Sequence, residues 1–271
     1  MNGFKSSRSY KEFACRIQRE RRFFRSTDDE EFLRKVVETS KNRVFKLEQG
    51  EELWRAQLGF DWQEEKLGDE CIDEFPVPFK PERMKPKPEH AKDGRANSCG
   101  IVVLYLASAK KTAMSEVRPW IGALVSCARL ETVRPLTLVD LSRFHDESSP
   151  YYFQEPDIAG REKAVWTDID KAFSKPVTSG DEIGDYVPTQ VLTELFKEEG
   201  FDGIVYKSNF GDIGYNITLF NPDDARITAC GLYEVESVAL SFKESGNPCH
   251  VSTDGKCKTI TVSDYGPVGV T

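Results

Sequence analysis

The amino-acid sequence predicts a mixed α/β fold, because two kinds of hydrophobic pattern are interspersed along its 271 residues. Short apolar runs rich in valine, isoleucine and leucine, such as residues 100–107, have the length and composition of buried strands. Between them lie segments whose apolar residues recur with helical spacing, such as residues 157–174. Hydrophobic residues make up 39% of the chain, which is enough for a sizeable core.

Residues 1–42 predict a basic N-terminal extension of two helices. The first, over about residues 9–25, places one set of apolar side chains on a single side: Tyr10, Phe13, Ala14, Ile17 and Phe24. Thr27 and Glu30 have the spacing of a capping box, which would open a second helix containing Phe32, Leu33, Val36 and Val37. Residues 1–26 hold eight Lys or Arg and two Glu, so this segment is either a contact arm for a partner or a solvated helix face.

Residues 43–118 predict extended structure, a proline-rich loop, a strand and a helix. Residues 43–60 are extended around a turn at Gln49-Gly50. Five prolines within residues 76–88 exclude regular helix or central strand there, and the long loop is either a flexible linker or a lid over a site. After the strand at 100–107, Ser108 can cap a helix over residues 109–118.

The remainder alternates strands and helices. We expect strands at 121–128 and 135–141, then helices at 157–174 and at 189–199, the second ending at Gly200. In the first of these helices, Ile158, Val165, Ile169 and Phe173 would share one face. Further strands are expected at 203–207, 215–220 and 225–240. Residues 241–271 are polar and rich in glycine, so we interpret them as a peripheral C-terminal tail.

Composition excludes several classes of protein. The net charge of −8 argues against a general nucleic-acid surface, so we expect no direct nucleic-acid binding. No apolar run approaches the roughly 20 residues of a membrane helix, and the N-terminus lacks the hydrophobic region of a secretory signal. Seven cysteines spread over the chain do not resemble a disulfide framework, so a reducing cytoplasm is the simplest location. The three histidines are far apart, and we expect no metal site.

Five polar residues beside predicted strands carry the candidate chemistry. Arg55 and Arg95 each present a fork of donors that can hold a phosphate by two bonds. Tyr105 offers a flat face to an aromatic heterocycle, although a core role is its ordinary alternative. Glu116 lies at a helix C-terminus, where its charge opposes the helix dipole, as expected of a residue kept for a site. Ser208 supplies an adaptable hydroxyl, or else serves only the turn that follows it.

The same residues lie in three of five motifs that together resemble the RES domain, a family named for an arginine, a glutamate and a serine. The motifs occur in the family's order over residues 43–240: ELWRAQLG at 52–59, GRANSCGIVVLYLASAKKTAMSEVRP at 94–119, PTQ at 188–190, FDGIVYKS at 201–208 and GYNITLF at 214–220. The sequence departs from the family at Ala96, where many members have a tryptophan. One aromatic wall is then either missing or supplied by Trp54 or Trp62.

The resemblance implies an ADP-ribosyltransferase-like fold and an enzyme that consumes NAD as substrate, with no further cofactor. Characterised RES domains are toxins that destroy NAD by hydrolysis or phosphorolysis, typically paired with a helix-turn-helix antitoxin. It implies that Arg55 and Arg95 grip the pyrophosphate, Tyr105 stacks near the nicotinamide, Glu116 stabilises the oxocarbenium-like ribose and Ser208 orients the substrate. We also consider three residues that would support the site or the substrate: Asn97, Gln190 and Asn209.

Two other functional hypotheses stay open. In the first, the enzyme transfers ADP-ribose to a macromolecule that the basic N-terminus holds. In the second, the domain is not catalytic and binds a nucleotide or a partner protein. The sequence leaves the acceptor, any antitoxin and a homo-oligomeric state undetermined.

Overall fold

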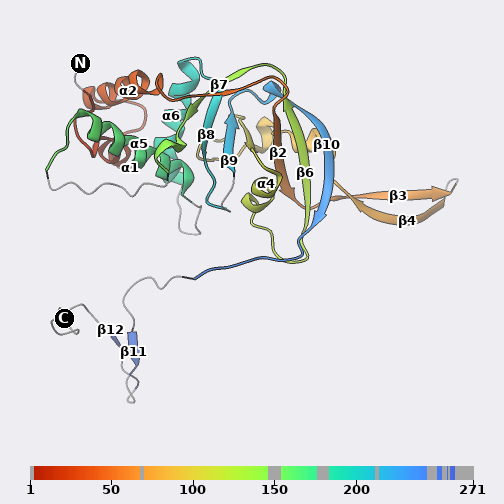
Figure 1. Cartoon of the computed structure of the whole chain (residues 1–271). Coiled ribbons are helices and arrows are strands. Elements are labelled where there is room, and N and C mark those ends of the chain that lie inside the picture. Colours follow the sequence, from red (N-terminus) through yellow and green to blue (C-terminus); the bar gives the residue numbers. More distant parts are fainter. Residues whose placement is uncertain are drawn as a thin grey trace, which may run out of the picture. The chain divides into compact units, whose positions relative to one another are not determined.

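The structure is a computed structural model that describes residues 3–67, 70–145, 154–175, 183–210, 214–242, 249–251, 255 and 257–259. The chain divides into two compact units, Met1–Glu236 and Ser237–Thr271. The first unit has the mixed α/β fold that the sequence predicts, with helices beside a large sheet (Figure 1).

An eight-stranded sheet forms the centre of the first unit, in the order β1-β7-β8-β9-β5-β2-β6-β10. Only β7 and β8 pair in parallel; every other neighbouring pair in this sheet is antiparallel. The strands are β1 (Val44–Leu47), β2 (Glu52–Leu58), β5 (Leu104–Ala107), β6 (Leu124–Thr132), β7 (Leu136–Asp140), β8 (Gly203–Lys207), β9 (Tyr215–Leu219) and β10 (Ala225–Glu234). Because strand side chains alternate between faces, β8 contributes Ile204 and Tyr206 to one hydrophobic cluster and Val205 to another.

Helices cover one side of this sheet. The four main helices, α1 (Ser9–Arg19), α2 (Thr27–Ser40), α5 (Ile158–Ser174) and α6 (Val187–Glu198), gather beside β7 and β8 (Figure 1). Their apolar faces meet in one cluster that includes Phe13, Val36, Trp166 and Phe196, all fully buried. Gly200 has a φ of 82° just beyond α6, which is the C-terminal glycine predicted there. The N-terminal helices therefore share a core with the rest of the unit, and their separation at residue 42 stays a prediction.

Several predicted boundaries in the N-terminal helices and in α5 are wrong. The capping box is formed by Ser26 and Asp29, one residue earlier than predicted, because both of its reciprocal bonds are made there. The first helix ends at Arg19, so Phe24 lies beyond it and is 82% exposed. At the start of α5, Ile158 is 48% exposed and does not share the buried face.

The proline-rich region contains more regular structure than predicted. Two strands, β3 (Asp61–Leu67) and β4 (Glu70–Val77), form a separate two-stranded ribbon in which Pro76 lies opposite Trp62. Proline is tolerated because both strands of such a ribbon are edges. The expected absence of helix is also wrong, since α3 (Pro81–Met84) and η1 (Pro88–His90) each start with a proline, where its missing N–H costs nothing.

The elements around residues 100–132 are shorter or later than predicted. Strand β5 begins only at Leu104, because Gly100 has a φ of 82° and the chain turns there. The helix α4 (Lys110–Glu116) has no side-chain cap, since Ser108 instead accepts a bond from the Tyr215 backbone amide. Ile121 is 58% exposed, ahead of the start of β6, and β10 ends at Glu234 rather than 240. Short η2 (Ser142–Phe144), η3 (Ile183–Tyr186) and η4 (Pro222–Asp224) connect the larger elements.

The second unit contains a small two-stranded sheet of β11 (Cys249–Val251) and β12 (Cys257–Thr259). Cys249 is disulfide-bonded, which departs from the expectation that the cysteines are all reduced. In the part of the chain that the structure describes, no helix has the length and apolar character needed to cross a membrane.

Candidate active site

A pocket of about 290 Å³ opens beside the middle strands of the large sheet, where β2, β5 and β9 pass under α4. Three predicted site residues, Arg55, Tyr105 and Glu116, line it together. The other lining residues are Trp54, Ala56, Leu106, Ala107, Ala113, Val117, Tyr206 and Asn216. The sheet therefore brings together residues that are far apart in sequence, up to the 162 positions between Trp54 and Asn216.

Glu116 is the last residue of α4 and the only carboxylate among those that line this pocket. Its Oε1 accepts two hydrogen bonds of 2.7 Å, from the Ser208 hydroxyl and from the Asn216 side-chain amide. Both bonds fall on the same oxygen, and Oε2 has no partner among the described residues. Two neutral donors thus orient the carboxylate while its second oxygen stays available.

Ser208 and Asn216 reach Glu116 from two adjacent strands. Ser208 follows β8 directly and is 3% exposed, and its Oγ also accepts a bond from the Phe210 backbone amide. Asn216 lies in β9, opposite Tyr206 on one side and Ala107 on the other. Asn216 is not among the site residues predicted from the sequence. Its signal was an asparagine within an otherwise apolar strand, where this residue type is disfavoured.

Arg55 enters the pocket from β2 with part of its hydrogen-bonding capacity unused. One guanidinium nitrogen donates to the Tyr105 backbone carbonyl at 3.0 Å, whereas the buried Nε has no partner in the described structure. Burial lowers the pKa of Arg55, although an arginine remains charged at neutral pH. A buried cation with an unpaired donor is costly unless an anion completes its shell, so the geometry favours an anionic ligand here.

Tyr105 lies in β5, and its hydroxyl is fixed from the other side by the 94–97 turn. The hydroxyl donates to the Asn97 side chain at 2.8 Å and accepts from the Ala96 amide at 3.0 Å. Burial, together with Tyr206, raises the pKa of Tyr105, which keeps the hydroxyl protonated as a donor. A side chain at Gly94 would collide with this hydroxyl, so glycine is required for the close approach.

Tyr206 forms a further wall of the pocket from β8. Burial and, second, the negative charge of Glu116 raise the pKa of Tyr206 to about 12. The ring therefore remains neutral beside the carboxylate. Trp54 also lines the pocket, whereas Trp62 lies on the ribbon and is 62% exposed. Of the two tryptophans considered as replacements for a wall at Ala96, only Trp54 lies among the lining residues.

Arg95, Asn97 and Gln190 hold the 94–97 turn rather than line the pocket. Arg95 donates to the Phe173 carbonyl at 3.0 Å, which ties the turn to the end of α5. The Asn97 amide donates to three backbone carbonyls of the same loop, and Gln190 donates to the carbonyls of Gly94 and Asn97 at 2.9 Å. The turn that positions the Tyr105 hydroxyl is thus clamped from α6.

Asn209 and Arg118 border the Glu116–Ser208 contact. Asn209 is exposed, and its side-chain amide donates to the Ser174 carbonyl. Arg118 follows α4 with a φ of 49°, the one non-glycine residue with positive φ in the described chain, and its guanidinium lies 5.2 Å from the centre of the Phe210 ring. Gly211, which was expected to complete the turn after Ser208, lies outside the described residues.

A second pocket, of about 810 Å³, adjoins the first through the shared residue Arg55. It is lined mainly by the proline-rich segment and carries five basic residues, Arg55, Lys80, Arg83, Lys85 and Lys87, against Asp61 and Glu82. Lys80 and Lys87 have no ion-pair partner among the described residues. A chain of net charge −8 therefore places a positively charged hollow directly next to Glu116's pocket. No group of three or more metal-ligating side chains occurs within the described residues.

Residues 52–240, which include every residue of the two pockets, match the family model of the RES domain. The chain belongs to the RES domain family. No curated protein matches its sequence. Among solved structures it is similar to a chain from the "Crystal structure of the M.tuberculosis MbcT-MbcA toxin-antitoxin complex", with 14% identity, a TM-score of 0.42, and coverage of 73% of this chain and 92% of that chain. That similarity is too low to carry a conclusion about the site of this RES domain.

Proposed function

We propose that this RES domain cleaves the N-glycosidic bond between nicotinamide and ribose in NAD. One observation carries the proposal: a single carboxylate, Glu116, is oriented by two neutral donors in a pocket that it shares with Arg55. Membership of the RES family, whose characterised members consume NAD, supports the same chemistry. The domain division 1–42, 43–240 and 241–271 is proposed with it.

Glu116 would act by charge. As nicotinamide departs with the bonding electron pair, positive charge develops on the ribose ring, and a fixed carboxylate lowers the energy of that state. Because Ser208 and Asn216 occupy only Oε1, Oε2 is free to accept a bond from a ribose hydroxyl. Neutral donors suit this role, since a lysine or arginine in their place would cancel the charge that the reaction needs.

The two pockets together match the two halves of a dinucleotide. Pockets for small organic ligands span about 300–1,000 Å³, so the first pocket alone suits only the nicotinamide riboside end. Arg55 lies where both pockets meet and would hold the pyrophosphate, while the basic second pocket would receive the other nucleotide. The proline-rich segment then acts as a wall of the site, which favours the lid interpretation over a simple linker. Ser208 and Tyr105 would orient the nicotinamide riboside. The turn held by Arg95, Asn97 and Gln190 would support Tyr105, and Asn209 would support the segment that carries Ser208.

The acceptor of the ADP-ribosyl group is water or phosphate in the leading proposal. A toxin of a toxin–antitoxin system, acting in the cytoplasm with a helix-turn-helix antitoxin as partner, is the biological role that the family suggests. The second candidate is transfer to a macromolecule, and it is favoured by the basic pocket, whose exposed Lys80 and Lys87 could contact a large acidic acceptor.

Product analysis with the full chain tests the proposal. Purified protein is mixed with NAD, with and without inorganic phosphate, and the products are separated. We expect nicotinamide release that is lost in Glu116→Gln and retained in Glu194→Gln, an exposed carboxylate on α6. Free ADP-ribose would identify water as the acceptor, and a phosphorylated ADP-ribose would identify phosphate. ADP-ribose attached to a macromolecule would identify transfer. Intact NAD under every condition would overturn the proposal.

A further inference from the structure

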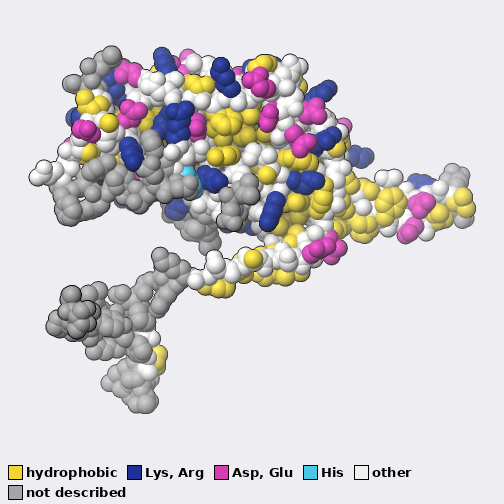
Figure 2. Space-filling view, in the orientation of Figure 1, with side chains coloured by type: hydrophobic (Ala, Val, Ile, Leu, Met, Phe, Trp, Pro, Cys, Tyr) yellow, Lys and Arg dark blue, Asp and Glu magenta, His cyan; other side chains and the backbone are white. Residues whose placement is uncertain are grey.

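The ribbon of β3 and β4 extends away from the large sheet and displays an unusual surface. Figure 1 shows it leaving the first unit at the end remote from α1 and α2. Four large apolar side chains on it are exposed: Trp62 (62%), Leu67 (75%), Ile72 (56%) and Phe75 (40%). Hydrophobic side chains follow its length in Figure 2, with acidic side chains among them. An exposed apolar surface of this kind typically marks an interaction site.

The ribbon is also strongly acidic. Its described residues hold six carboxylates and a single lysine, Lys66, which is paired with Glu64 at 2.8 Å. Glu65 and Glu74 are exposed and have no ion-pair partner among the described residues. A two-stranded ribbon is at best marginally stable alone in water, and its two free edges invite pairing, so a partner that covers it would stabilise it.

The loop between α1 and α2 has the opposite charge and the same apolar character. Residues 19–25 contain four arginines, Arg19, Arg21, Arg22 and Arg25, against one glutamate, and all of them are exposed. Phe23 is 91% exposed and Phe24 is 82% exposed, which is extreme for phenylalanine. Residues 17–24 enclose an open hollow of about 310 Å³. The loop therefore combines basic groups, two apolar side chains and a concave surface.

The ribbon and the loop are complementary in charge, and both expose aromatic side chains at opposite ends of the first unit (Figure 1). Their positions prevent them from meeting within one molecule. A second molecule can present its loop to the ribbon of the first, so that arginines face Glu64 and Glu74 while Trp62, on the same face of the ribbon, enters the hollow beside Phe23. Buried aromatic side chains supply most of the energy of such contacts, and the charges select the partner.

We propose that the acidic ribbon of one copy of this chain docks on the basic 19–25 loop of a second copy. A joined pair leaves the loop of one copy and the ribbon of the other unused, because the contact joins two different surfaces. Such head-to-tail contacts continue into a ring or a filament rather than stop at a dimer. The assembly is consequently expected to grow with protein concentration and to weaken as salt screens the charges.

Sedimentation velocity of the full chain over a range of concentrations, at about 0.1 M and about 0.5 M salt, tests this inference. The ribbon variant is Glu64→Lys with Glu74→Lys, two carboxylates that lie opposite each other on the face of Trp62, and the loop variant is Arg21→Glu with Arg22→Glu. The control is Glu198→Lys with Glu199→Lys, which changes the net charge as the ribbon variant does, at exposed positions near the end of α6. All six positions are exposed, so none of these changes enters the core.

We expect the wild type and the control to assemble, and each variant alone to sediment as a monomer. Mixing the two variants should give a 1:1 dimer that grows no further, because one retains the loop and the other the ribbon. That result also shows that both variants are folded. A wild type that stays monomeric, a loop variant that assembles like the wild type, or a mixture that contains only monomers would each overturn the proposal. Assembly lost only in the ribbon variant would indicate ribbon-to-ribbon pairing instead.

Discussion

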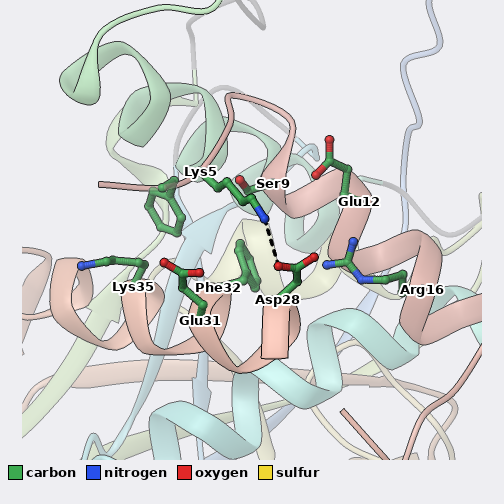
Figure 3. Close-up of a pocket in the computed structure, with 9 residues that line it drawn as sticks. Lys5, Ser9, Glu12, Arg16, Asp28, Glu31, Phe32 and Lys35 are labelled. Carbon is green, nitrogen blue, oxygen red and sulfur yellow. Dashed lines mark hydrogen bonds and ion pairs between the residues drawn. The ribbon is translucent and has the colours of Figure 1, made fainter. Parts of the chain in front are cut away.

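Two of the pockets that contain charged side chains differ in how those charges are satisfied. The pocket between α1 and α2 is lined by six charged residues, Lys5, Glu12, Arg16, Asp28, Glu31 and Lys35 (Figure 3). Ion pairs join Lys5 to Asp28 at 3.0 Å, Arg16 to Asp29 at 2.7 Å and Lys35 to Glu38 at 2.6 Å. Only about 80 Å³ of space remains between these helices. The pair of Arg16 with Asp29 joins α1 to α2, and the pocket leaves little room for a ligand.

The pocket at Glu116 has the opposite arrangement. Its two charged groups, Glu116 and Arg55, are bound by neutral donors and acceptors rather than by each other. Oε2 of Glu116 and Nε of Arg55 have no partner among the described residues. A functional site is therefore marked less by the number of its charges than by charges that the protein itself leaves unmatched.

The largest effect is expected from removing the charge of Glu116. Glutamine can still accept the bonds of Ser208 and Asn216, so Glu116→Gln should keep its melting temperature and its affinity for NAD. Turnover should fall by about 100-fold or more, because the negative charge that stabilises the developing cation is lost. Nicotinamide release and a thermal melt measure the two properties. An unchanged turnover would mean that Glu116 is not the stabilising group.

The two donors to Glu116 should have a smaller effect. Ser208→Ala and Asn216→Ala should each lower kcat by about tenfold with little change in KM, because the carboxylate loses its orientation but keeps its charge. The double variant should lose less than the product of the single effects, since both residues act on one oxygen. Ser208→Thr keeps a hydroxyl and is the control. A larger change in KM than in kcat would assign these residues to substrate binding.

Arg55→Lys should raise KM by about tenfold, because a single ammonium replaces the guanidinium fork. The burial that lowers the pKa of Arg55 will lower that of a lysine in the same place, into a range where it titrates. The KM of the lysine variant should therefore improve as the pH falls from about 8 to 6, whereas the wild type keeps its charge throughout. Arg129→Lys, at a surface arginine, controls for general effects. A pH-independent KM in the variant would argue against an anionic ligand at this position.

Local sequence patterns account for much of the fold. The helix α5 and the strand β8 occur where periodicity and composition predicted them, because each pattern is contained within one element. The prediction of Ser108 as a helix cap was wrong, because its hydroxyl accepts a hydrogen bond from the backbone amide of Tyr215, which is distant in sequence. The β3–β4 ribbon was missed because its strands carry few β-branched residues and one proline, so local propensity gave no signal.

The site shows the same division. Glu116 stood out because its charge conflicts with its place at a helix end, which is a local signal. Asn216 did not, because its role depends on the register of β9 against β5 and β8, which no single segment encodes. The unmatched donor of Arg55 likewise depends on what surrounds it in space. The residue types of a site can thus be read locally, but which of their atoms stay unsatisfied requires the tertiary structure.

Between α1 and α2, where Asp29 pairs with Arg16, a substitution of Asp29 is expected to change stability and leave turnover unchanged. Burial raises the pKa of this carboxyl, but bonds from Ser26 and Arg16 outweigh burial and lower it. Asp29→Asn should therefore cost about 1 kcal/mol of unfolding free energy near neutral pH. That stability is present above the unfolded pKa of about 3.9 and is lost as the pH falls through the lower folded value, so the two proteins should converge in acid. Denaturant titrations at several pH values measure this.

The smallest effect is expected from Lys5→Met, which removes the ion pair to Asp28. Both side chains are mostly exposed, at 71% and 59%, so solvent and salt screen their attraction, and the loss should not change the melting temperature measurably. Turnover should also be unchanged, since this pocket lies between α1 and α2 and shares no residue with the one at Glu116. A loss of turnover comparable with that of Arg55→Lys would show that the charged pocket at the N-terminus is part of the working site, and the contrast between the two pockets would then be wrong.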